Sequence, residues 1–240
     1  MDIDDILKEF ERSSSKKFEK SSTNICQELT EAMLNERMAP ELLPYKGSLM
    51  STILSYISNQ QQLLLDSHEY GDMNSGNGII SDDFKLRLMI IETDVERLSY
   101  LVRLYLRTRL TKLNKFTIYY VNESHNNSGD DDNEEEQKQL LSVEERDYIN
   151  NYLKLLTQLY NNCFLKKLPN ILTLLDDNVG GQNMITTPDT DSLVFVKCIS
   201  DVPITVYMDE EEMDLERDGV YVVKYSLIKA YLDIGDVKLI

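Results

Sequence analysis

The stretch FKLRLMIIETDVERLSYLVRLYLRTRLTKLNKF, residues 84–116, decides the fold. It contains neither glycine nor proline, so no residue in it interrupts a helix. Its apolar side chains would lie on more than one side of that helix: Leu86, Leu88, Met89, Ile90, Ile91, Val95, Leu98, Leu101, Val102, Leu104, Tyr105 and Leu106. A helix that is apolar on several sides is buried on several sides. We therefore expect either a central core helix or a helix that covers a second subunit.

Two helices are predicted before this one. The first spans Asn24–Met38, where Asn24 and Gln27 resemble a capping box. The second runs roughly over residues 48–67, after a connection that Pro40 and Pro44 make stiff and extended. Glycine, asparagine and serine in residues 71–78 predict a flexible loop.

After residue 116 the sequence predicts a loop and a fourth helix. Residues 122–139 are acidic and polar, which is typical of a disordered segment. Ser142 and Glu145 have the spacing of a capping box, and the helix that they open runs to about Lys167 and closes at Pro169. A short helical turn is expected over residues 171–175.

The period of the pattern changes near the C-terminus. Residues 176–183, with Gly180 and Gly181, read as a linker. Strand-forming runs follow at residues 193–199, 202–208, 220–225 and 237–240, with a turn at Asp218-Gly219 and an amphipathic segment at 226–232. The sequence thus predicts a mainly α chain: an N-terminal helical bundle, residues 21–175, followed by a small β-rich module, residues 184–240.

Residues 1–20 read as a flexible tail with one short helix. Ile3, Ile6, Leu7 and Phe10 have the i, i+3, i+4, i+7 spacing of one helix face. A helix this short is marginal alone in water and would form by laying its apolar face into a groove on another protein. The alternative from spacing alone is a frayed terminus.

Composition restricts the class of protein. The net charge is -17, which disfavours nonspecific binding of nucleic acid or an anionic membrane. Cys26, Cys163 and Cys198 are few and far apart, so a reducing compartment is expected. The N-terminus lacks the features of a secretory signal, and no apolar run approaches the length of a membrane span. We expect a soluble cytosolic or nuclear protein.

The sequence offers no catalytic, cofactor or metal motif. It has no CxxC, HxxxH or HExxH pattern, no P-loop and no GxSxG nucleophile elbow. The histidines are His68 and His125, both in or near predicted loops. A hydrolase reading therefore lacks a motif, and we expect a non-catalytic protein without cofactor or metal.

One charge pattern stands out on the third helix. It carries Arg97, Arg103, Arg107, Arg109, Lys112 and Lys115 in an otherwise acidic chain. Like charges three or four residues apart disfavour an isolated helix, so anionic groups should neutralise them. The candidates are carboxylates of this chain, a partner subunit, or nucleic acid. The helix is also strongly apolar, which favours the first two; a nucleic-acid-binding module is the alternative function.

Three stretches together carry a resemblance to a known family. They are NERMAPELLPY at 35–45, ETDVERL at 92–98 with RLYLRTRLTKL at 103–113, and GVYVVKY at 219–225 with VKLI at 237–240. In order and spacing they resemble the GINS proteins of eukaryotic DNA replication, and among them subunits of the Sld-five type from fungi. The resemblance implies an α-helical A domain and a small β-rich B domain.

The same resemblance implies partners and a place of action. It implies a heterotetramer with three sister GINS subunits, joined in the nucleus to the MCM ring and the Cdc-forty-five protein as the replicative helicase. ATP hydrolysis would belong to the MCM ring, and any DNA contact of this chain would be weak. The residues implied as interface or structural are Arg97, Arg103, Tyr105, Arg107, Arg109, Tyr221, Tyr225, Leu239 and Ile240. The tail residues Asp4, Asp5, Ile6, Leu7 and Phe10 resemble the helix by which fungal members bind a trimeric replisome hub of the Ctf-four type.

Overall fold

The computed structural model describes residues 18–74, 82–126, 140–169, 185–208 and 211–240. The chain forms two compact units. The first comprises the chain up to Met33 together with Lys46–Tyr105, and the second comprises Leu34–Tyr45 together with Leu106–Ile240. The predicted tail helix, the helical turn at 171–175 and the linker at 176–183 lie outside the described residues, and the predicted domain boundaries stay a prediction.

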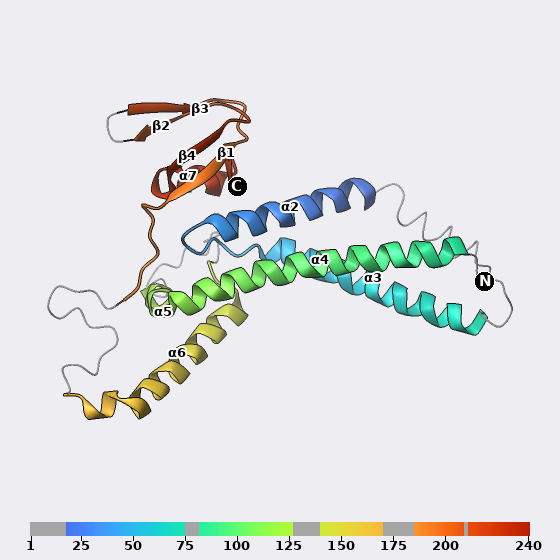
Figure 1. Ribbon diagram of the computed structural model, residues 1–240, viewed down its shortest axis with the longest axis horizontal. Helices are drawn as coiled ribbons and strands as arrows, with labels where there is room; N and C mark the ends of the chain where they lie inside the picture. Colours follow the sequence, from blue (N-terminus) through green and yellow to red (C-terminus); the bar gives the residue numbers. More distant parts are fainter. Residues whose placement is uncertain (1–17, 75–81, 127–139, 170–184, 209–210) are drawn as a thin grey trace, which may run out of the picture. The chain divides into compact units, whose positions relative to one another are not determined.

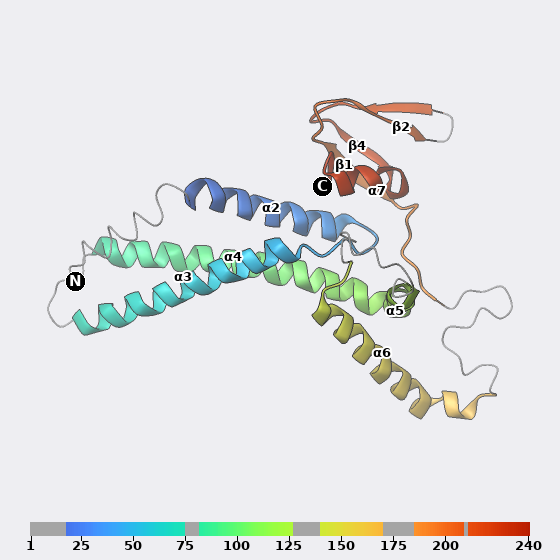
Figure 2. The ribbon, with the colours of Figure 1, turned by 180° about the vertical axis from the view of Figure 1, so that it is seen from behind.

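Three long helices, α2 (Phe18–Met38), α3 (Gly47–Asn74) and α4 (Asp82–Lys115), make up the first unit. They run along one another there (Figures 1 and 2), and α2 and α4 continue into the second unit. Their buried apolar side chains include Leu29, Met50, Ile53, Val95, Val102 and Tyr105. The predicted third helix is thus confirmed as one unbroken helix.

Two helix boundaries differ from the prediction. Helix α2 begins at Phe18, so Asn24 lies inside the helix and does not cap it. The preceding residues contain no glycine or proline, and polar side chains alone do not end a helix. Helix α3 continues through Gly71 to Asn74, because one glycine costs a helix only about 1 kcal/mol relative to alanine.

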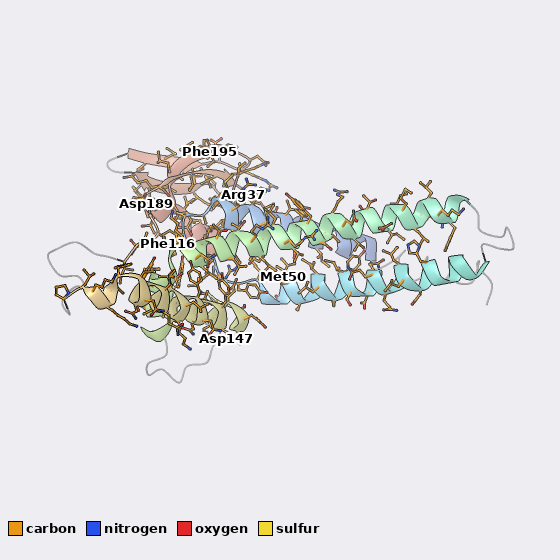
Figure 3. All side chains as sticks on the ribbon, turned by 60° about the horizontal axis from the view of Figure 1, so that its bottom comes forward. Arg37, Met50, Phe116, Asp147, Asp189 and Phe195 are labelled. Carbon is orange, nitrogen blue, oxygen red and sulfur yellow. The ribbon has the colours of Figure 1, made fainter. Side chains whose placement is uncertain are left out.

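The helical part of the second unit follows directly on α4. Thr117 Oγ1 donates a hydrogen bond to the Leu113 carbonyl (2.7 Å) where α4 gives way to α5 (Thr117–Asn126). The loop predicted from residue 122 is therefore still helical up to Asn126. Tyr120 and Val121 of α5 are buried against the end of α4, and this packing stabilises α5. In Figure 3, Phe116 marks the end of α4 and Asp147 the start of α6.

The predicted capping box at the start of α6 (Val143–Cys163) is confirmed. The Glu145 amide donates to Ser142 Oγ (3.1 Å), and the Ser142 amide donates to the Glu145 carboxylate (3.0 Å). A short 3-10 helix, η2 (Leu165–Lys167), follows before Pro169. The α-helix is therefore about one turn shorter than predicted. The turn that follows it has 3-10 geometry, which is common at helix ends.

The C-terminal module contains two small antiparallel sheets and a helix. Strands β4 (Val220–Lys224), β1 (Leu193–Cys198) and β5 (Val237–Leu239) form a sheet in that order, and β2 (Ile204–Met208) pairs with β3 (Glu211–Leu215). Helix α7 (Tyr225–Ile234) ends at Gly235, whose φ of 95° suits glycine. The core includes Val194, Val196, Cys198, Val206, Leu215, Val223 and Ile228.

Local details of the module follow from its sequence with one exception. The turn before β4 is confirmed, and a Cβ added at Gly219 would lie 2.5 Å from the Tyr221 ring, so the ring would have to shift. Strand β3 was not predicted, because its acidic sequence EEMDL has low β-propensity. Pairing with β2 and burial of Leu215 override that local preference.

The prediction of a helical N-terminal region followed by a small β-rich module is thus confirmed. Across the ranges that the structure describes, none of the helices is both long enough and apolar enough to cross a membrane.

Candidate functional site: a buried ion network and exposed apolar rows

Arg109 on α4 is the centre of a buried ion network in the second unit. Its side chain is fully buried, and its guanidinium makes five hydrogen bonds. Nε and Nη2 donate to the two carboxylate oxygens of Glu145 (2.7 and 2.9 Å), and Nη1 donates to Glu36 (2.9 Å). The remaining donors reach the carbonyls of Leu43 (2.6 Å) and Leu140 (2.8 Å). All five guanidinium N–H groups are therefore satisfied.

Lys112 adds a second cation to the same network. Its ammonium donates to the Glu36 carboxylate (2.8 Å), to the Glu36 carbonyl, and to the Glu41 carbonyl (2.7 Å). Burial lowers the pKa of Lys112, and the nearby Glu36 carboxylate acts in the opposite direction. Glu36 thus accepts from both Arg109 and Lys112, and the buried charges are paired rather than isolated.

The segment Leu34–Tyr45 also holds the C-terminal module. The Glu41 carboxylate accepts hydrogen bonds from the Tyr225 hydroxyl (2.8 Å) and from the Lys229 ammonium (2.9 Å). The Leu239 amide donates to Asn35 Oδ1 (2.9 Å), and Ala39 lies in the core of the module. Burial and the adjacent Glu41 carboxylate both raise the pKa of Tyr225, so its hydroxyl stays protonated and donates.

The structure separates the basic residues of the third helix into two groups. Arg109 is buried and pairs with carboxylates of its own chain. Arg97, Arg103 and Arg107 are exposed, and Arg97 lies 3.4 Å from Asp94. The groups that sequence reasoning missed are the acceptors Glu36, Glu41 and Glu145. Glu36 and Glu41 lie in the stretch NERMAPELLPY, but nothing local shows that they meet residues 71 to 188 positions away.

The other residues singled out from the sequence have varied surroundings. Tyr105, Tyr225 and Leu239 are buried, whereas Ile240 is exposed. The Tyr221 ring covers Gly219, and its hydroxyl accepts a hydrogen bond from the Glu216 amide (3.0 Å). The tail residues 4–10 lie outside the described residues. In the part of the chain that the structure covers, no group of three or more histidine, cysteine or acidic side chains could hold a metal ion.

Helices α4 and α6 expose rows of large apolar side chains. In the first unit, α4 exposes Leu86, Met89 and Ile90, which lie on one face at i, i+3 and i+4. In the second unit, α6 exposes Tyr148, Leu155 and Leu159, at i, i+7 and i+11. Exposed apolar rows of this kind mark protein–protein interaction sites. The exposed rows are suited to binding other proteins.

Comparison with known proteins agrees with this reading. Residues 25–164 match the family model described as the GINS complex protein helical bundle domain, and residues 188–240 match the C-terminus of the DNA replication complex GINS protein SLD5. The DNA replication complex GINS protein SLD5 of Debaryomyces hansenii is 58% identical over all of this chain and 98% of its own length. Its namesake in Saccharomyces cerevisiae is 31% identical over 89% of this chain and 79% of its own length. The DNA replication complex GINS protein sld5 of Schizosaccharomyces pombe is 30% identical over 90% of this chain and 92% of its own length.

The first prediction concerns Arg109. Arg109→Met removes the cation and leaves Glu145 and Glu36 buried with fewer partners, which should cost about 3–5 kcal/mol. Arg109→Lys should recover only part of this, because an ammonium cannot form the bidentate pair with Glu145. The measurement is hydrogen exchange, by mass spectrometry, of α2 and α6 in the chain co-expressed with sister GINS subunits. Arg107→Met, an exposed change on the same helix, is the control and should change exchange little.

The second prediction concerns the contact between Glu41 and the C-terminal module. Tyr225→Phe keeps the buried ring and removes the hydroxyl that donates to the carboxylate. A hydrogen bond to a charged group is worth about 1.5–3 kcal/mol, so exchange of the α7 and β5 amides should rise about tenfold or more. Tyr207→Phe, on the exposed side of β2, serves as the matched control. Equal exchange in the two variants would show that Glu41 does not hold the module.

Proposed function

Because the chain belongs to the SLD5 family of GINS proteins, we propose that it is a non-catalytic structural subunit of a GINS complex, in which it assembles with three sister subunits. The complex would act in the nucleus with the MCM ring and the Cdc-forty-five protein, as part of the replicative helicase. The family matches confirm the resemblance that the sequence motifs indicated. Assembly, rather than chemistry, is the role that the exposed apolar rows support.

The observation that carries this proposal is the exposed row on α4. Leu86, Met89 and Ile90 each expose more than half of their surface. Leaving such a row in water costs free energy that burial against a partner would recover. Because the same helix is buried along its other side, through Val95 and Val102, the row is a second apolar face of one helix. A helix between its own core and a sister subunit needs two such faces.

The nucleic-acid alternative is weakened by the ion network. The basic helix would contact phosphates through free cations, but Arg109 is fully buried and Lys112 is committed to Glu36 and the Glu41 carbonyl. Of the arginines singled out on this helix, Arg97, Arg103 and Arg107 remain exposed. We propose no more than a weak DNA contact for them, because fewer phosphate contacts mean lower affinity.

The third prediction tests assembly. Met89→Asp with Ile90→Asp places two charges on the apolar row, and an unpaired charge in an interface costs several kcal/mol. We expect affinity for the sister subunits to fall at least about a hundredfold. Size-exclusion chromatography with light scattering on the four co-expressed subunits would then show loss of the 1:1:1:1 particle. The parent chain alone should aggregate.

The control keeps the row apolar. Met89→Leu with Ile90→Leu should give the same 1:1:1:1 particle as the parent chain, since it changes shape but not polarity. If the aspartate variant assembles as well as this control, the row is not an interface. If the parent chain is a stable monomer that ignores the three sister subunits, the proposed function itself is wrong.

The fourth prediction concerns the tail, for which we propose binding to a trimeric hub of the Ctf-four type. The sequence pattern supports this, since Asp4 and Asp5 precede the apolar Ile6, Leu7 and Phe10 at helical spacing. Ile6→Ala with Leu7→Ala removes apolar groups worth about 2 kcal/mol or more, so binding to the purified hub should weaken about thirtyfold in calorimetry. Ser13→Ala with Ser14→Ala should bind normally. Loss of the 1:1:1:1 particle in the first variant would show that the tail belongs to the folded core.

A further inference from the structure

Thr187 and Pro188 form the only threonine-proline or serine-proline pair of the chain. The other prolines follow alanine, leucine or valine. The pair lies in the stretch ITTPDTDS, residues 185–192, which leads into β1. We call this stretch the β1 leader. A hydroxyl residue followed by proline is the pair that proline-directed protein kinases recognise, so the β1 leader contains a candidate phosphorylation site.

The pair lies on the surface of the second unit. Thr187 is exposed, and residues 186–189 belong to neither a helix nor a strand. Asp189 of the same leader is labelled in Figure 3. The residue before a proline is restricted to extended conformations. Thr187 is therefore presented in a form that can lie across a catalytic cleft, and a segment that is already extended loses less freedom when it binds.

The hydroxyl of Thr187 differs from those of threonines in the helices and strands. Six helical threonines donate their hydroxyls to carbonyls of the preceding turn: Thr30, Thr52, Thr93, Thr111, Thr117 and Thr157. On β2, Thr205 donates to Asp214 (2.7 Å). Thr187 makes no hydrogen bond to any residue that the structure describes. Its hydroxyl can therefore react without the loss of such a bond.

The β1 leader is fixed to the module only after the pair. The Thr190 carbonyl accepts a hydrogen bond from the Ser226 amide (2.9 Å), and the Ser192 carbonyl accepts one from the Tyr225 amide (3.0 Å). Both contacts involve the backbone of residues that follow Thr187. A kinase can thus bind Thr187 without unfolding the module, and substitutions at Thr187 leave these contacts in place.

The neighbouring residues indicate the class of kinase. Pro188 has no amide N–H. A kinase pocket without a hydrogen-bond acceptor at this position selects proline, because any other residue would bury an unpaired donor. The β1 leader contains Asp189 and Asp191 and neither lysine nor arginine. A kinase that also requires a basic residue after the proline is therefore unsuited, which favours the mitogen-activated class, for which the proline suffices.

We propose that Thr187 is phosphorylated by a proline-directed protein kinase, with ATP as the phosphoryl donor. Thr187 Oγ1 attacks the γ-phosphorus of ATP and forms an O–P bond. The bond between the γ-phosphorus and the oxygen that bridges the β- and γ-phosphates breaks, and ADP leaves with the electron pair. A carboxylate base of the kinase takes the hydroxyl proton. The product adds a charge of about -1.5 to -2 beside Asp189 and Asp191.

The experiment treats the assembled four-subunit complex with a purified, active mitogen-activated protein kinase and Mg-ATP. Mass spectrometry of this chain should find phosphate on Thr187, approaching one per chain. Thr187→Val, which keeps the shape of the side chain, should abolish this modification, and Thr187→Ser should retain it. Pro188→Ala should lower the initial rate at least about tenfold, because the alanine amide would be buried unpaired. Thr190→Val, at a nearby exposed threonine without a following proline, should change the rate little.

A synthetic peptide of residues 181–194 tests whether the site is accessible in the folded protein. The kinase should modify the complex and the peptide with kcat/KM values within about tenfold of each other, since no unfolding is needed. If the peptide is modified and Thr187 of the complex is not, the assembly covers the site and the inference is wrong. It is also wrong if Pro188→Ala leaves the rate unchanged. Formation of the 1:1:1:1 particle is measured before the kinase is added, so failure of the proposed function is seen separately.

Discussion

The arrangement of the second unit depends on the pairing of Arg109 with Glu36 and Glu145. Arg109 binds groups from α2, from the segment after α2, and from the start of α6. Taking these charges out of water is costly, so the network adds little net stability over an apolar alternative. A packing that separated these segments would leave a buried charge unpaired, which is strongly unfavourable. Within the second unit, the end of α2, the end of α4 and the start of α6 are therefore held together around one guanidinium.

The segment Leu34–Tyr45 connects the buried ion network to the C-terminal module. One part of it is held to α4 through Glu36, and another part holds the C-terminal module through Asn35, Ala39 and Glu41. A module of fewer than sixty residues is marginal alone, because it buries too small a share of its surface. Ala39 enlarges its core, and Glu41 pairs with Lys229 and Tyr225. Folding of the module is thereby linked to the helical region that precedes it.

Features set by neighbouring residues could be predicted from the sequence, and features set by distant ones could not. The unbroken α4, the capping box of Ser142 and Glu145, and the β-branched strands each follow from a local pattern. Strand β3 and the second half of α5 depend on pairing or burial against other segments, which overrides local preference. The like-charged arginines predicted that anionic groups would be near. The sequence could not show that these groups are Glu36 and Glu145, because they lie 73 and 36 positions away from Arg109.

Charged and apolar groups have different roles in this chain. Buried charges are matched within the second unit, so Arg109 and Lys112 are unavailable to outside ligands. Large apolar groups are left unmatched at Met89 and Ile90 on α4, at Leu155 on α6, and at Phe195 on β1. A soluble monomer would gain by covering or replacing such groups, since each exposes apolar area to water. In the proposed subunit, partners would cover these groups, which is a reason for the chain to keep them exposed.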